Sequence, residues 1–91
     1  MLFAWMGMFK ADAGPVPQSV QHDALGFLEQ PYINIHSGGP LCDGGGKHVG
    51  MMMIFETEDR AAAEAFVKDS PFLAAGLYEH HHLYEYRNEA G

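Results

Sequence analysis

The order of residue periodicities along the chain constrains the fold more than any single motif does. Alternating or wholly apolar runs, which are typical of strands, are interrupted twice by apolar residues at helical spacing. In chain order the expected elements are a strand at 2–9, a helix at 18–29, strands at 32–37 and 48–56, a helix at 58–69 and a strand at 77–87. This βαββαβ order predicts an α+β, ferredoxin-like fold, with two helices on one face of a four-stranded antiparallel sheet.

Two of the strands are expected at the centre of the sheet, because "LFAWMGMF" at 2–9 and "HVGMMMIFE" at 48–56 are apolar on both faces. The methionines of the second run are expected to fill irregular gaps in the core. Between the second and third strands, "GGPLCDGGGK" at 38–47 contains five glycines and a proline, and it predicts a loop. It lacks the GKS or GKT ending of a phosphate-binding loop, which favours a conformational role.

Each helix is expected to bury one side. In the first helix that side carries Val20, Ala24, Phe27 and Leu28, and in the second it carries Ala62, Ala65, Phe66 and Asp69. Thr57 is expected to cap the second helix, with Glu58 and Asp59 placing negative charge at its positive end.

Composition narrows the classes of partner. A chain of 91 residues with a net charge of −7 is expected to be one domain, residues 1–91, that repels nucleic acid and anionic membranes. Cys42 is the only cysteine, which excludes an internal disulfide and fits a cytoplasmic location. The apolar N-terminal run is too short to cross a bilayer.

The sheet face without helices is expected to be covered by a second copy of the chain, giving a homodimer.

Three consecutive histidines, His80 to His82, lie in the last expected strand. Alternation along a strand predicts that His80 and His82 share a face with Tyr78, Tyr84 and Tyr86, while His81 points the other way. Two of these imidazoles could ligate a metal ion, with His36 or His48 as a third ligand, but no carboxylate or cysteine cluster supports the site, and no cofactor is expected. The alternative is a face of aromatic and imidazole rings in a dimer interface or cleft wall. We expect His81 to be partly buried and hydrogen-bonded.

The stretch "GGPLCDGGGKHVGMMMIFE", followed by "EDRAAAEAFVKDSPFLAAGLYEHHHLYEY", resembles the YciI family of YCII-related domains. The shared pattern is a Gly-Pro turn with an Asp after it, a Gly opening the third strand, an Ala-rich helix with an acidic start, a Pro-aromatic step and an Ala-Gly before the last strand. The resemblance implies a dimeric α+β barrel protein with a small-molecule ligand. Some related proteins are enzymes, including a dehydrochlorinase acting on a chlorinated hydroxyhydroquinone.

The resemblance also implies a His-Asp active site, which falls on His22 and Asp43, beside a cleft near the first helix and the Gly-Pro loop. His22 would transfer the proton and Asp43 would orient its imidazole. Many members carry an Arg three residues before the helix histidine, where this chain has Ser19, and an Asp-Pro step where it has Ser70-Pro71.

Simpler interpretations remain beside this one. His22 lies opposite the apolar side of its helix and could be merely solvent-exposed, and Asp43 beside glycines could be a turn residue. Cys42 is expected to be a buried or idle thiol and Ser70 a helix-end or turn hydroxyl.

The sequence therefore gives three candidate functions. The first is a small-molecule enzyme of the lyase or isomerase type. It would use proton transfer to catalyse an elimination or an isomerisation of a cyclic or aromatic metabolite. The second is a non-catalytic ligand-binding or dimeric assembly module. The third is a metal-binding protein.

Overall fold

The computed structural model describes residues 1–12 and 14–90; Ala13, in the loop predicted between the first strand and the first helix, lies outside these ranges. The elements are β1 (Leu2–Phe9), α1 (Gln18–Leu28), β2 (Asn34–Cys42), β3 (His48–Glu56), α2 (Arg60–Lys68), α3 (Pro71–Ala74) and β4 (Tyr78–Tyr86). The predicted order is confirmed, with the short α3 added before β4. None of the described helices is long and apolar enough to cross a membrane.

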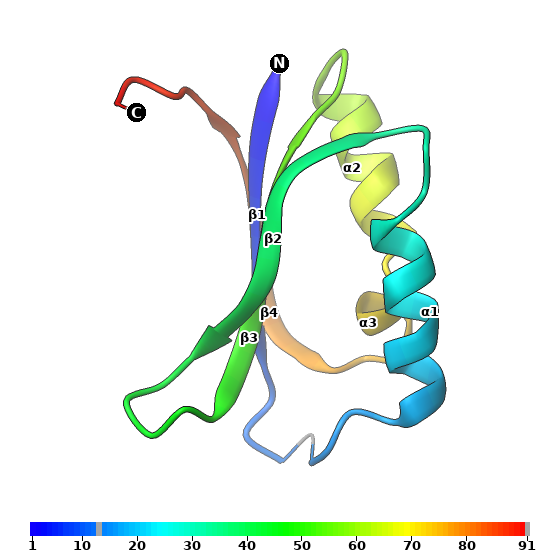
Figure 1. Cartoon of the computed structure of the whole chain (residues 1–91), viewed down its shortest axis with the longest axis vertical. Helices are drawn as coiled ribbons and strands as arrows, with labels where there is room; N and C mark the ends of the chain where they lie inside the picture. The colour runs from blue at the N-terminus through cyan, green and yellow to red at the C-terminus, as the bar shows by residue number, and fades with distance from the viewer. Residues whose placement is uncertain (13, 91) are drawn as a thin grey trace.

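The four strands form one sheet in the order β2-β3-β1-β4, and every neighbouring pair is antiparallel. The two strands predicted to be central, β1 and β3, are the inner pair. Figure 1 shows the sheet nearly edge-on, with α1, α2 and α3 all on one side of it and none of the described helices on the other. This is the ferredoxin-like arrangement that the sequence predicted.

The core lies between the helices and one face of the sheet and is built largely from aromatic rings. Phe3, Trp5 and Phe55 are the largest fully buried side chains. Phe66 of α2 stacks on Phe27 of α1, with ring centroids 4.6 Å apart, and lies 5.0 Å from Phe55 of β3. Phe66 therefore contacts both the first helix and the sheet. The predicted apolar side of α1 is confirmed, with Ala24 buried at its centre.

The second strand is longer than predicted, because β2 continues through "GGPLC", which was expected to be loop. The strand tolerates Pro40 because β2 is an edge strand, where a missing backbone N–H leaves no partner on the outer side unpaired. Register shifts after Ile35 and Leu41 absorb the irregular sequence. The loop itself shrinks to the hairpin turn after Cys42.

The start and the buried side of α2 also differ from prediction. Asp59, not Thr57, caps the helix, since its Oδ1 accepts a hydrogen bond from the Ala62 backbone N–H at 2.9 Å. The Thr57 hydroxyl instead donates to the Asp59 carbonyl oxygen at 3.0 Å. The helix buries Ala63, Phe66 and Val67 rather than Ala65 and Asp69. Phe66 and Val67 are the bulkiest apolar residues of the helix, and burying both shifts its buried side from the predicted one.

A register shift in β4 reverses the predicted face of one tyrosine. Met8 pairs with His80, but Phe9 pairs with Tyr78, so Glu79 is an extra residue in the strand. Tyr78 therefore lies on the helix side of the sheet and is only 8% exposed. His80 and His82 point to the other side with Tyr84 and Tyr86, as predicted. Alternation held along the strand except at this one bulge.

Candidate functional site

Two adjacent spaces open between the sheet and the helices. We call the larger one the outer groove; it has a volume of about 760 Å³ and lies between the loop before α1, the start of α1 and the β2–β3 hairpin. The smaller one, the inner cavity, measures about 20 Å³, which is room for one water molecule, and lies beneath α1. Met51 and Phe72 line both spaces. The predicted cleft near the first helix and the Gly-Pro segment is confirmed, because Gln21 and Pro40 both line the outer groove.

The outer groove combines apolar walls with positive charge. Its lining includes Lys10 and Lys47, two of the five Lys and Arg residues in a chain of net charge −7, together with His48. Phe9 and Phe72 are aromatic wall residues. Apolar walls with a few convergent polar groups are the usual composition of a small-molecule site. The groove therefore suits a small ring compound that carries negative charge.

Asp43 holds the hairpin that presents Lys47 and His48. Its Oδ1 accepts hydrogen bonds from the backbone N–H of Gly45 at 2.8 Å and of Lys47 at 3.0 Å. Its own backbone N–H donates to the Lys47 carbonyl oxygen at 2.9 Å, and Gly46 has a φ of 83°, which favours glycine. The interpretation of Asp43 as a turn residue is confirmed by these contacts, and they fix the backbone from which Lys47 projects.

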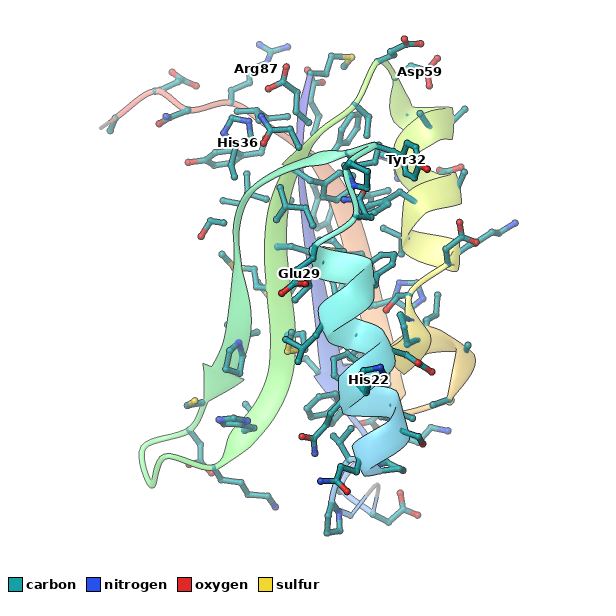
Figure 2. All side chains as sticks on the ribbon, turned by 45° about the vertical axis from the view of Figure 1, so that its right-hand side comes forward. His22, Glu29, Tyr32, His36, Asp59 and Arg87 are labelled. Carbon is teal, nitrogen blue, oxygen red and sulfur yellow. The ribbon has the colours of Figure 1, made fainter. Side chains whose placement is uncertain are left out.

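His22 is exposed on the surface of α1 (Figure 2). Over residues 1–12 and 14–90 no hydrogen bond joins His22 to Asp43, and neither residue lines the outer groove or the inner cavity. Each is adjacent to a residue that lines the outer groove: His22 follows Gln21 in the sequence, and Asp43 is hydrogen-bonded to the backbone of Lys47. The structure therefore does not bring the two together as a pair, and their catalytic role stays a prediction.

Tyr78, which lines the inner cavity, carries a buried hydroxyl. Among residues 1–12 and 14–90 the phenolic oxygen has no hydrogen-bond partner. Burial raises the pKa of the Tyr78 phenol, so the group stays protonated and can only act as a neutral donor or acceptor. Gly7 makes room for the ring, because a Cβ there would lie 2.6 Å from the indole of Trp5 and 2.9 Å from the Tyr78 ring.

Ser70 is the other hydroxyl beside the inner cavity. It is 4% exposed and precedes α3, so its predicted position at a helix end is confirmed, but its side chain makes no capping hydrogen bond. The Trp5 indole N–H also reaches this region, yet it donates to Nδ1 of His81 at 3.2 Å. Ser70 and Tyr78 are thus the hydroxyl-bearing residues that line the inner cavity.

The histidine triplet is divided as predicted. His81 is hydrogen-bonded, as expected, but it is exposed rather than partly buried, because it lies near the edge of the helix layer. The rings of His80 and His82 lie 5.6 Å apart on the opposite face. Within the described part of the chain, no three His, Cys, Asp or Glu residues are grouped so as to hold a metal ion.

Neither predicted third ligand joins these two histidines. His36 is on β2, at the opposite edge of the sheet and roughly 14 Å away across three strand spacings. Its Nε2 lies 2.9 Å from Oε1 of Glu56 (Figure 2 labels His36 on the side of the sheet away from the helices). His48 lines the outer groove instead. Cys42 is a free thiol, exposed at the end of β2 rather than buried.

The sequence did not predict that Lys10, Lys47 and His48 line one groove, and it placed Tyr78 on the wrong face. The lysines and His48 carry no motif, and only the fold brings Lys10, at the end of β1, to the same groove as the hairpin. The alternation of "YEHHHLYEY" placed Tyr78 on the same face as His80 and His82. The bulge at Glu79 turns it to the helix side instead.

Solved structures of other proteins share this fold. The 5-chloro-2-hydroxyhydroquinone dehydrochlorinase TftG from Burkholderia phenoliruptrix AC1100, solved in complex with 2,5-dihydroxybenzoquinone, is 25% identical, with a TM-score of 0.84 over 96% of this chain and 94% of that one. An uncharacterized NIPSNAP domain protein from Burkholderia xenovorans is 19% identical, with a TM-score of 0.52 over 100% and 99% of the two chains. Rv0793 from Mycobacterium tuberculosis is 11% identical, with a TM-score of 0.51 over 99% and 97%.

The last two similarities concern the fold alone. No curated protein sequence matches the chain. The YCII-related domain, however, matches residues 1–87, nearly the whole chain and every helix and strand of the structure. The chain therefore belongs to the family of YCII-related domains.

Proposed function

We propose that this protein is a small-molecule enzyme that binds a cyclic or aromatic anion in the outer groove and transforms it by proton transfer. The observation that carries the proposal is the gathering of Lys10, Lys47 and His48 beside the aromatic walls of Phe9 and Phe72. A quinone ring bound to TftG, which shares the fold at 25% identity, supports the same class of ligand. The reaction type, elimination or isomerisation, is the part that rests on family analogy.

The groove is suited to stabilise charge on a ring oxygen. Two ammonium groups favour an enolate or phenolate over its neutral form, and the low polarity of the walls strengthens that attraction. The backbone of Lys47 is held by Asp43, so its side chain projects from a fixed point of the hairpin. A ligand oxygen that reached past Met51 and Phe72 would meet the unpaired hydroxyl of Tyr78.

Two histidines compete for the proton-transfer role. His22, with Asp43 as its orienting carboxylate, is the pair that the family resemblance implies. His48 is the histidine that lines the groove, next to Lys47. Imidazole suits the role because it changes charge near neutral pH. Replacing each histidine separately with Asn distinguishes the two assignments, since only the acting group should abolish turnover while leaving ligand binding intact.

Binding of 2,5-dihydroxybenzoquinone is measured by isothermal titration calorimetry. We expect Lys47→Met and Lys10→Met each to weaken binding by on the order of tenfold, because each removes one charge from the groove. Lys68→Met is the matched control, since Lys68 is on α2 and does not line the groove. Equal losses in all three variants, or no binding by the unchanged protein, would show that the groove is not the site.

Turnover is tested as chloride release from 5-chloro-2-hydroxyhydroquinone, the compound named for the relative. Chloride release that disappears in one histidine variant supports the enzyme. Tight binding of the quinone with no turnover of any chlorinated or isomerisable ring compound supports the non-catalytic binding module instead.

We also propose that a second copy covers the open face of the sheet. This face exposes Met6 (43%), Tyr84 (64%) and Tyr86 (37%), and Ile54 lies near its centre. Apolar side chains of this size gathered on one face favour self-association. Ile54→Lys, compared with the unchanged protein by sedimentation equilibrium, is expected to halve the mass. A monomeric unchanged protein at tens of micromolar would refute the dimer.

A further inference from the structure

The open face of the sheet carries two histidines along its β4 edge. In the antiparallel pairing of β1 with β4, His82 is the direct partner of Met6, and directly opposed residues share a face. His80 lies on the same face, with its ring 5.6 Å from that of His82. The ring of His82 in turn stacks on Tyr84 at 6.0 Å. Both histidines are exposed in the single chain, so a second copy that covers this face would cover them.

No opposite charge is positioned to offset protonation of either imidazole. Within the described part of the chain, neither ring has a hydrogen-bond or ion-pair partner. On one side β1 presents methionines to them, and on the other there is no strand, because β4 is an edge strand. Glu79, the extra residue before His80, forms no ion pair with either ring in the same part of the chain. Glu56, the carboxylate paired on this face, is on β3 and is already bonded to His36.

A symmetric dimer would place this face against an identical one. The facing surface then offers the same methionines, tyrosines and histidines and no new carboxylate. A protonated imidazole covered by such a surface loses its hydration without gaining a counter-charge, which is costly. The dimer therefore favours neutral rings at His80 and His82, whereas the free chain can protonate them.

Imidazole changes its charge between about pH 5 and 8. We infer that His80 and His82 make association through the open face pH-sensitive, so that the dimer formed at neutral pH dissociates as the pH falls toward about 5. The inference rests on the dimer proposed for this face and is independent of the outer groove, which lies on the helix side of the sheet.

The direction of this effect is opposite to the one that net charge predicts. The chain has a net charge of −7 near neutral pH and a pI of about 5.1, so two copies repel one another less as the pH falls. Net charge alone would therefore tighten the dimer in acid. Each histidine that stays neutral in the dimer but is protonated in the free chain instead weakens association by about tenfold per pH unit.

Sedimentation equilibrium of the full chain at constant ionic strength, at about pH 7.5 and about pH 5.5, measures the dissociation constant. We expect it to rise by on the order of a hundredfold between these two values, which corresponds to the uptake of about one proton per dissociation event. Circular dichroism at each pH checks that the separated chains remain folded.

The variants separate the two histidines from all other titrating groups. The double variant His80→Gln with His82→Gln keeps polar side chains but removes their titration, so its dissociation constant should stay the same or fall in acid. His22→Gln is the matched control, because His22 is exposed on α1, on the helix side of the sheet (Figure 2). It should retain the full pH dependence of the unchanged protein.

Different results would refute the dimer and the pH effect. A dimer that is equally tight or tighter at about pH 5.5 would overturn the inference and leave the dimer itself intact. A pH dependence that survives in the double histidine variant would assign the effect to other groups. Loss of the circular dichroism signal in parallel with dissociation would make unfolding its cause. A monomer at both pH values would refute the dimer and the inference together.

Discussion

Removing the hydroxyl of Tyr78 is expected to stabilise the free protein. The oxygen is buried without a partner, while the ring keeps its contacts with Trp5 (centroids 5.0 Å apart) and Phe9 (5.4 Å) whether or not the hydroxyl is present. An unpaired buried polar group costs about 1–3 kcal/mol. Tyr78→Phe should therefore raise the free energy of unfolding by about 1 kcal/mol, which is roughly 4–8 °C in Tm for a domain of this size.

Urea denaturation at neutral pH, monitored by the fluorescence of Trp5, measures this change. Tyr84→Phe is the matched control, because Tyr84 is 64% exposed on the open face and its hydroxyl can bond to water. The control should stay within about 0.5 kcal/mol of the unchanged protein. A loss of about 1 kcal/mol in Tyr78→Phe would refute the reasoning, since it would mean that a bound water already satisfies the hydroxyl in the inner cavity.

The same substitution has a signature at alkaline pH. Burial raises the pKa of Tyr78 in the folded protein, whereas in the unfolded chain the phenol titrates near its ordinary value of about 10. The stability contributed by the protonated phenol is complete below about pH 10 and is lost as the pH rises above it, because only the unfolded state then releases the proton. Tyr78→Phe should lose less stability than the unchanged protein between about pH 10 and 11. Parallel curves for the two proteins would contradict the buried, protonated phenol.

If the Tyr78 hydroxyl binds a ligand, removing it should weaken ligand binding while it stabilises the free protein. If an oxygen of 2,5-dihydroxybenzoquinone pairs with Tyr78, Tyr78→Phe weakens that binding by about tenfold, corresponding to the hydrogen bond lost. Higher stability with lower affinity is the combination that a purely structural hydroxyl would not produce. Unchanged affinity would mean that the ligand occupies only the outer groove and does not reach Tyr78.

Further substitutions test the hairpin, the core and a helix cap, each by thermal and urea denaturation. Asp43→Ala removes two hydrogen bonds to backbone N–H groups and should cost about 1 kcal/mol; no loss would mean that the glycine turn holds without it. Gly7→Ala pushes a methyl group into the rings of Trp5 and Tyr78 and should cost about 1–3 kcal/mol, so a neutral result would contradict the close packing. Asp59→Ala should cost about 1 kcal/mol as the loss of an N-cap, and an equal cost in Asp69→Ala, at the other end of the same helix, would argue against capping.

The sequence was sufficient for the order of elements, because local periodicity and local steric signals depend on neighbouring residues only. The apolar runs at 2–9 and 48–56 predicted the inner strands β1 and β3, and the spacing of Val20, Ala24 and Phe27 predicted the buried side of α1. The resemblance added a cleft near the first helix, and the outer groove lies there.

Tertiary structure alone decided the features that depend on register and long-range pairing. A single extra residue, Glu79, turned Tyr78 into the core, and alternation cannot reveal an extra residue before its partner strand is known. Likewise, β2 extends through the glycines because β3 supplies its hydrogen bonds, although the segment reads as loop by itself.

The outer groove and the pairing of Met6 with His82 have the same origin. Lys10 and Lys47 are 37 positions apart and meet only because β1 ends beside the hairpin, and Met6 faces His82 only because β1 and β4 pair. The sequence by itself determined which residues were available for chemistry. Pairing between distant strands decided which of them act together, since that pairing is selected by burial of the whole core and not by any local pattern.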